Sequence, residues 1–403
     1  MSEHFDPQPL LRLRPQTLRT TFLALGLLIV VTAIQIGAPQ LLGQTPGTID
    51  YLIFHHVGEL ANAGRLPLAY DAAAFEAYQA ARPQGGPFMP WTYPPQFNLI
   101  TQGLAIFPAG IGYALFIALG MAALVCTLYR LSSQHAAAAI LLTLPAWLMN
   151  IRAGQNGFLT ALLFALTFLL ILRARPAAGG GALGLLAYKP HLGLGVGLVA
   201  LFRGGWKLVL SAALTLLFTL ALATWVYGVE IWPAFLQSVR DSGAFLRAGA
   251  YPMERMTSVF ALLTSFGIGP AIALPAQALM ALTCLSLVGY ALLRSWPMPY
   301  VLALSVIAGL GVSPYGYDYD LIALAPALAL ASPALARHAR TRERHTLIAA
   351  LLLATGWGLL TVILNRPLAM LPFSPPALGA IGYLATLTLS FRILSRAHTH
   401  NPA

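Results

Sequence analysis

The chain has 403 residues, of which 58% are hydrophobic and only 9% are charged, and its mean hydropathy is +0.74. So few charges cannot cover the surface of a water-exposed body of this size, which excludes a soluble globular protein, and the high hydrophobicity excludes an intrinsically disordered chain. The formal net charge of +11 would suggest nucleic acid as the partner of a soluble protein. In a membrane protein the same charge can belong to the loops on one side of the membrane. The positions of the basic residues therefore decide between a nucleic-acid partner and membrane topology.

Apolar stretches of about 20 residues, the length of a membrane-crossing helix, recur along the chain. The first, 20–42, is longer than the apolar part of a signal peptide and has no clear cleavage site after it, so we expect a retained anchor. Lys189-Pro190-His191 interrupts the stretch 181–202, and because proline breaks a helix we expect two short helices that meet there. Residues 176–181, PAAGGG, predict a short flexible loop. Further spans are predicted at 110–130, 136–151, 157–172, 206–227, 270–293, 299–314, 320–336, 345–364 and 377–394, with half-spans or interfacial helices at 96–108 and 256–267.

These stretches predict an all-α polytopic membrane protein of about 10–13 transmembrane or half-spanning helices, forming a single integral membrane domain over 1–403. It would have a basic cytoplasmic tail (1–19), a long first outer loop (43–95) and a basic cytoplasmic loop (337–345). Short loops that stay in the cytoplasm are enriched in Lys and Arg. If both termini are cytoplasmic, only three of the 12 acids, Glu3, Asp6 and Glu343, lie on the cytoplasmic side. The same side then holds 15 of the 23 basic residues: Arg12, Arg14, Arg19, Arg130, Arg173, Arg175, Arg203, Lys207, Arg294, Arg337, Arg340, Arg342, Arg344, Arg392 and Arg396. The positive charge is thereby explained by membrane topology, and we expect no nucleic-acid partner.

Polar residues in or beside membrane spans are costly, so they are candidates for function. The first outer loop opens with Asp50-Tyr51 and ends with Trp91-Thr92-Tyr93-Pro94-Pro95, where aromatic residues can anchor at the interface. Between them, the pattern over 51–63 predicts an amphipathic helix lying along the membrane surface, with Leu52, Val57, Leu60 and Ala61 toward lipid.

A second polar cluster, Arg152-Ala153-Gly154-Gln155-Asn156-Gly157, separates two apolar stretches. A cation with two amides suits a phosphate and hydroxyl groups. An ordinary hydrophilic turn with an Asn-Gly signal explains the same residues equally well.

Further along the chain, Lys189 is deep in an apolar segment and needs a partner, a water-filled cavity or a route to the surface. A bound phosphate would serve as that partner. The turn Ser313-Pro314-Tyr315-Gly316-Tyr317-Asp318-Tyr319-Asp320 joins two spans; its tyrosines fit an interfacial belt, but its two acids do not. In the outer loop 228–257, Glu254 and Arg255 are the better candidates because they adjoin a span.

Taken in order, these short motifs resemble glycosyltransferase family 87, which is also catalogued as a domain of unknown function and includes polyprenol-phosphate-mannose-dependent mannosyltransferases. The resemblance runs collinearly from about residue 48 to 330. It is carried by Asp50-Tyr51, Ala69-Tyr70-Asp71, Tyr93-Pro94-Pro95, Gly154-Gln155-Asn156-Gly157, Tyr188-Lys189-Pro190-His191, Ser313-Pro314-Tyr315 and Asp318-Tyr319-Asp320.

The resemblance implies a GT-C-like helical bundle in a bacterial inner membrane, with its active site on the outer, periplasmic face. Such an enzyme moves a hexose, with mannose as one candidate, from a polyprenyl-phosphate sugar to a lipid or glycan acceptor, with inversion. Asp50 is at the place of the general base. Lys189, Arg152 and His191 would bind the donor phosphate, while the sugar and acceptor would be bound by Tyr51, Tyr93, Gln155, Asn156, Tyr315, Asp318 and Asp320.

Asp318 and Asp320 occupy places where mannosyltransferases of this family carry histidines, so the sugar stays open. We expect no cofactor and no metal, because a lipid phosphate can leave without a nucleoside diphosphate. Two other functions stay open: a transporter or flippase for a lipid-linked or anionic substrate, with Lys189 at a broken helix, and a structural subunit in which these residues are only interfacial. The enzyme hypothesis requires that Asp50, Arg152 and Lys189 line one cavity.

Overall fold

The computed structural model describes residues 15–43, 50–82, 88–364 and 374–400. Within these ranges the chain forms helices and a single isolated β-bridge between Met256 and Tyr317. Most of the basic tail predicted at 1–19 lies outside the described residues. The helices in chain order are α1 (Pro15–Gly37), α2 (Pro39–Leu42), α3 (Asp50–Asn62), α4 (Pro67–Tyr70), α5 (Ala72–Ala80), α6 (Pro95–Leu104), α7 (Ala109–Leu131), α8 (Ala136–Leu142), α9 (Leu144–Ala153), α10 (Gly157–Leu172), α11 (Pro176–Leu185), η1 (Leu186–Tyr188), α12 (Pro190–Arg203), α13 (Trp206–Tyr227), α14 (Ile231–Arg247), η2 (Met253–Arg255), α15 (Val259–Ser265), α16 (Pro270–Leu293), α17 (Met298–Gly309), η3 (Asp318–Ala323), α18 (Leu324–His338), α19 (Thr341–Ile363) and α21 (Gly379–His400).

The predicted all-α polytopic architecture is confirmed. Six described helices are long and apolar enough to cross a membrane, the bent pair α8–α9 could form a seventh span, and three shorter apolar helices, α10, α12 and α17, accompany them. Together these make ten, at the lower end of the predicted 10–13. The helix α21, predicted as a span at 377–394, is not among the six.

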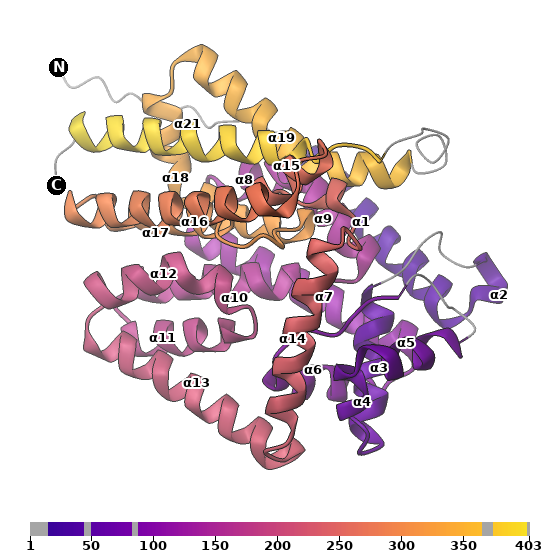
Figure 1. Cartoon of the computed structure of the whole chain (residues 1–403). Coiled ribbons are helices and arrows are strands. Elements are labelled where there is room, and N and C mark those ends of the chain that lie inside the picture. The colour runs from indigo at the N-terminus through magenta and orange to yellow at the C-terminus, as the bar shows by residue number, and fades with distance from the viewer. Residues whose placement is uncertain (1–14, 44–49, 83–87, 365–373, 401–403) are drawn as a thin grey trace.

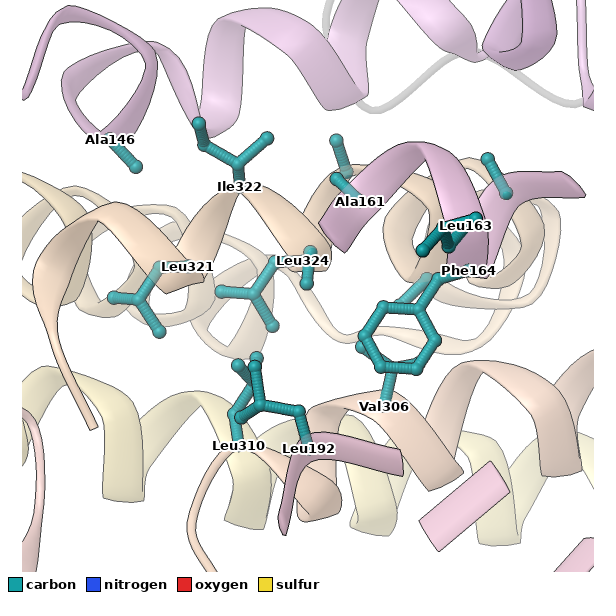
Figure 2. Packing of buried hydrophobic residues seen from close by; sticks show 14 of the residues in the cluster. Ala146, Ala161, Leu163, Phe164, Leu192, Val306, Leu310, Leu321, Ile322 and Leu324 are labelled. Atoms are coloured by element: carbon teal, nitrogen blue, oxygen red, sulfur yellow. The ribbon is translucent and has the colours of Figure 1, made fainter. Parts of the chain in front are cut away.

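The helical bundle is built around the segment formed by η3 and α18. Its most apolar 18-residue window is 94% buried, whereas the corresponding window of α13 is 6% buried and presents its side chains to the surroundings. Figure 2 shows Leu321, Ile322 and Leu324 of this central segment packed among labelled side chains of α9, α10, α12 and α17. Since lipid tails are as apolar as leucine, such packing and internal hydrogen bonds must supply much of the cohesion between helices in a membrane.

The break predicted at Lys189-Pro190 is present: α11 continues directly into η1, which ends at Tyr188, and α12 begins at Pro190. Proline at the first helical position costs no hydrogen bond, because that N–H would have no partner within the helix. In Figure 1, α12, α17 and α21 run roughly parallel in successive layers, and contacts of α17 with both neighbours join them.

Two predictions about local structure were wrong. Residues 176–181, expected as a flexible loop, form the first part of α11, because α11 packs along α13 and this tertiary contact overrides the low helix propensity of glycine. The helix expected over 51–63 exists as α3, but Val57, Leu60 and Ala61 are buried in the protein core and do not face lipid. The described residues of the segment predicted as the first outer loop therefore contain helices, as expected, and α3 is built into the bundle.

The contact between α12 and α17 requires a residue without a side chain at Gly195. A Cβ atom there would collide with the backbone carbonyl of Ser305, whereas a Cβ at Gly197, on the same helix, would have no heavy atom within 4 Å. We predict that Gly195→Ala destabilises the protein by about 1–3 kcal/mol, as overpacking does. Gly197→Ala should leave the stability unchanged or raise it by up to about 1 kcal/mol, because alanine is the better helix former. Thermal unfolding in detergent measures both, and equal effects of the two substitutions would contradict this packing.

Candidate active site

Lys189 is the N-cap residue of α12 and is 5% exposed. Its Nζ donates a hydrogen bond to Oδ1 of Asp320 at 2.6 Å, and both side chains are buried. The same Nζ lies 5.1 Å from the ring centre of Tyr319 and 5.8 Å from that of Tyr93. The lysine therefore has a protein partner, which the sequence did not reveal, and it is surrounded by one carboxylate and two aromatic faces.

A second buried ion pair joins Arg255 of η2 to Asp318. Arg255 donates from Nη2 to Oδ1 at 3.1 Å and from Nε to Oδ2 at 3.3 Å. The Asp318 carboxylate also accepts a hydrogen bond from the backbone N–H of Tyr319 at 2.8 Å. Burial disfavours the charge of Arg255, but the carboxylates of Asp318 and Asp50 outweigh burial and raise its pKa. Two hydrogen bonds between the same two groups fix the guanidinium in one orientation.

Asp50 is the first residue of α3 and is 4% exposed. Its Oδ2 accepts a hydrogen bond from Nε2 of Gln155 at 2.9 Å. The Gln155 amide is oriented by two donors to its Oε1: the hydroxyl of Tyr93 at 3.2 Å and the backbone N–H of Asn156 at 3.1 Å. With its oxygen so occupied, the amide presents its NH₂ group to the carboxylate. Burial raises the pKa of Asp50, and the nearby Arg255 and the Gln155 hydrogen bond only partly oppose that.

The sequence left two interpretations of residues 152–157, an ordinary turn and a polar cluster that binds a ligand. In the structure the segment forms a turn, and its Arg152 and Gln155 side chains line the cavity. Gly154 ends α9 in the left-handed conformation, with φ 69°. A Cβ there would collide with the side chain of Tyr51, so glycine is needed for conformation and for space. Oδ1 of Asn150 accepts from the backbone N–H of Gly157 at 2.8 Å and holds the start of α10 beside it.

A cavity of about 1720 Å³ brings most of the predicted site residues together. Asp50, Arg152 and Lys189 all line it, which meets the geometric requirement set by the sequence. Apolar walls extend from this polar centre along α1, α14 and α19. The other predicted residues that line the cavity are Tyr93, Gln155, His191, Tyr315 and Asp320, and Glu254 and Arg255 line it as well.

Three predicted residues lie outside the lining of this cavity. Tyr51 is fully buried and packs edge-on against Tyr113, with ring centres 5.5 Å apart. Asn156 is fully buried at the start of α10. Asp318 is 1% exposed and accepts hydrogen bonds from two residues that line the cavity, Arg255 and Tyr319. These positions suit support of the lining side chains better than contact with a sugar or an acceptor.

Arg255 is the main cavity residue that lacked a role in the sequence-based site. It was singled out only because it adjoins a span. A signal was available: two acids in an apolar turn require two cations, and Lys189 supplies one. Among the described residues, no group of three or more His, Cys, Asp or Glu side chains is arranged to hold a metal ion.

Comparison with known proteins identifies the family to which the chain belongs. The model of glycosyltransferase family 87 matches residues 91–314, more than half of the chain. The chain belongs to glycosyltransferase family 87. It is thus a multi-pass membrane protein of a glycosyltransferase family, and the predicted family is confirmed. The matched region contains Arg152, Lys189 and Arg255, whereas Asp50 and Asp320 lie outside it.

A structure search finds the crystal structure of ArnT from Cupriavidus metallidurans bound to undecaprenyl phosphate. The two chains are 14% identical, the alignment covers 96% of this chain and 78% of ArnT, and the TM-score is 0.36. No site or substrate of this chain follows from a similarity of that size. No curated protein matches the sequence.

The Arg255–Asp318 pair predicts a large effect on stability. Asp318→Asn would leave the charge of Arg255 buried without its partner, and we expect a loss of about 3–5 kcal/mol, as for other broken buried ion pairs. Glu230→Gln, which removes the same charge from an exposed position before α14, should change the stability by less than about 0.5 kcal/mol. Thermal unfolding of the two variants in detergent checks this, and a small loss in Asp318→Asn would mean that the pair contributes little.

Proposed function

We propose that this glycosyltransferase of family 87 moves a hexose from a polyprenyl-phosphate sugar to a hydroxyl of a lipid or glycan acceptor. The observation that carries the proposal is the cavity in which the buried carboxylate of Asp50 faces the cations of Lys189, Arg152 and Arg255. Family membership supports sugar transfer. The resemblance to polyprenol-phosphate-mannose-dependent members supports the donor class and makes mannose one candidate sugar.

In the reaction, the acceptor oxygen attacks the anomeric carbon from the face opposite the phosphate. A bond forms between these two atoms, the bond from the anomeric carbon to the phosphate oxygen breaks, and its electron pair leaves with the lipid phosphate. The acceptor proton passes to Asp50. A single displacement of this kind inverts the anomeric configuration and needs no covalent intermediate on the enzyme. Burial suits Asp50 to this task, because a base with a raised pKa holds the proton more firmly.

The cations are suited to the leaving group. Negative charge grows on the lipid phosphate as its bond to the sugar breaks, and fixed positive groups in a cavity of low polarity stabilise that charge strongly. Lys189 lines the cavity at the start of α12, so the positive end of that helix also faces the site. His191, in the first turn of the same helix, lines the cavity next to them.

Helix directions support an active site on the outer face, with both termini inside. The helices α10, α12 and α18 begin beside the cavity and end near basic residues: Arg173, Arg203 and Arg337. The basic end of α12 lies beside the segment that joins α16 to α17, since Arg203 donates a hydrogen bond to the carbonyl of Trp296 at 2.7 Å. The helix α10 alone spans about 24 Å, at 1.5 Å for each of its 16 residues. Because basic loops stay in the cytoplasm, the cavity would open on the opposite side.

A transporter for an anionic lipid is the second candidate, favoured by the helix break at a buried lysine. The buried Asp50 carboxylate, held by the oriented amide of Gln155 in the same cavity as the cations, favours the transferase, because sugar transfer needs a base at that place. Movement of a sugar lipid across liposomes without a glycosidic product would favour the transporter.

Asp50→Asn tests the base. We predict that it lowers kcat/KM for sugar transfer by about 10²–10⁴-fold, measured with reconstituted protein, a polyprenyl-phosphate sugar and hydroxylated acceptors. The same variant should unfold at an equal or higher temperature than the wild type, because it removes a charge whose burial is unfavourable. Asp71→Asn is the matched control in the same loop: Asp71 caps α5 through the N–H of Ala74, and asparagine can accept that bond too. Activity of Asp50→Asn equal to that of Asp71→Asn would remove Asp50 as the base.

The raised pKa of Asp50 also predicts a pH dependence. A general base works only when deprotonated, so kcat/KM should fall as the pH is lowered through the pKa of Asp50. Because burial raises this pKa, the fall should be centred above 3.8, the usual value for aspartate. The residual activity of Asp50→Asn should lack this acid limb of the pH profile, that is, the fall of kcat/KM at low pH. A limb that persists unchanged in Asp50→Asn would assign the titration to another group.

A further inference from the structure

The two buried aspartates of η3 differ in their access to the cavity. Asp318 lies outside the cavity lining, and two hydrogen bonds fix its partner Arg255. Asp320 lines the cavity itself and holds Lys189 by one hydrogen bond, 2.6 Å long. A ligand phosphate in the cavity would therefore meet the Lys189–Asp320 pair directly, and it would meet the Arg255–Asp318 pair only from the side of Arg255.

We propose that Asp320 is a positioning residue that competes with the lipid phosphate for Lys189 and so drives release of the product. This inference rests on the proposed function. Before a ligand binds, Asp320 neutralises Lys189. When a lipid phosphate binds, Lys189 shares its hydrogen bonds between the phosphate and the carboxylate of Asp320. After the reaction, the ion pair between Lys189 and Asp320 forms again and the product phosphate leaves.

The chemistry of the reaction creates the need for such a residue. The donor is a phosphodiester with one negative charge, whereas the product is a phosphate monoester that carries about −1.5 to −2 near neutral pH. Cations that stabilise the leaving group therefore bind the product more tightly than the donor. A carboxylate that competes for the same ammonium group limits this excess affinity.

The surroundings of Lys189 allow the exchange. An ammonium group has three hydrogen-bond donors, and Asp320 takes one of them. In the described part of the chain, Asp320 is the one carboxylate within ion-pair distance of Lys189. The rings of Tyr93 and Tyr319 flank the ammonium group at longer distances and tolerate a shift of its position. The lysine can therefore form a bond to phosphate without leaving its site.

Two small probes test the proposal: farnesyl phosphate, a monoester, and its methyl phosphodiester. Their binding to the full chain in nanodiscs is measured by titration calorimetry at neutral pH. Asp320→Asn should bind farnesyl phosphate at least tenfold more tightly than the wild type, and its affinity for the diester should rise less. Glu254→Gln is the matched control, because Glu254 lines the same cavity but forms no ion pair in the described part of the chain. It should change both affinities by less than threefold.

Two further substitutions separate the charge of Asp320 from its shape. Asp320→Glu retains the charge and should keep the weaker binding of the wild type. Lys189→Met in the Asp320→Asn background should abolish the gain in affinity. In a transfer assay, Asp320→Asn should show a fast first turnover followed by a slowed steady state, since product release becomes limiting.

The outcomes are separable. Wild-type protein that does not bind farnesyl phosphate would contradict the donor site of the proposed function. Wild-type protein that binds it, with Asp320→Asn binding equally or more weakly, would overturn only the role of Asp320. Asp320→Ser serves if Asp320→Asn does not fold; if neither neutral variant folds, the ion pair is purely structural and the proposal is wrong.

Discussion

The structure depends on the cost of burying the charges of Asp318 and Asp320 in an apolar bundle. Each buried carboxylate would cost several kcal/mol without a partner, so each is tied to a cation from a distant segment. Lys189 comes from the break between η1 and α12, and Arg255 comes from η2 after the long helix α14. Two ion pairs thus fasten two distant segments of the chain to η3, which begins the most deeply buried of the candidate spans.

This arrangement places positive charge where a phosphate would sit and keeps it compensated while the site is empty. Asp50 reaches the same cavity from α3 and is oriented through Gln155 and Tyr93. Acid and cations lie close enough to influence each other, as the effect of Arg255 on the pKa of Asp50 shows. A base and a phosphate-binding group within one cavity are the two components that a direct displacement at a sugar carbon needs.

The sequence predicted those features that local patterns determine. Apolar stretches predicted the spans, and Pro190 predicted the helix break. The cost of a charge in an apolar stretch marked Lys189 as a residue that needs a partner, and Asp318 and Asp320 as acids that an interfacial belt does not explain. The order of short motifs indicated the family, which the family model confirms. The roles assigned to individual site residues stay predictions.

Features that depend on tertiary contacts could not be predicted in this way. Lys189 and Asp320 are 131 residues apart, and no local pattern connects them. The direction of Tyr51, one residue from Asp50, depends on Tyr113 and Gly154 across the bundle. The glycine-rich start of α11 is helical where it packs against α13 and α10. In each case a contact between distant segments decides between conformations that the local sequence allows.

An experimental structure with bound farnesyl phosphate tests most directly whether a lipid phosphate binds at Lys189, in the cavity that Asp50 also lines. The account predicts phosphate oxygens within hydrogen-bond distance of Nζ of Lys189. A non-bridging phosphate oxygen, equivalent to the one that carries the sugar in the donor, should point into the space beside Asp50, and the farnesyl chain should lie along an apolar wall of the same cavity. A phosphate bound away from this cavity, or density showing the Lys189–Asp320 pair untouched beside a distant lipid, would contradict it.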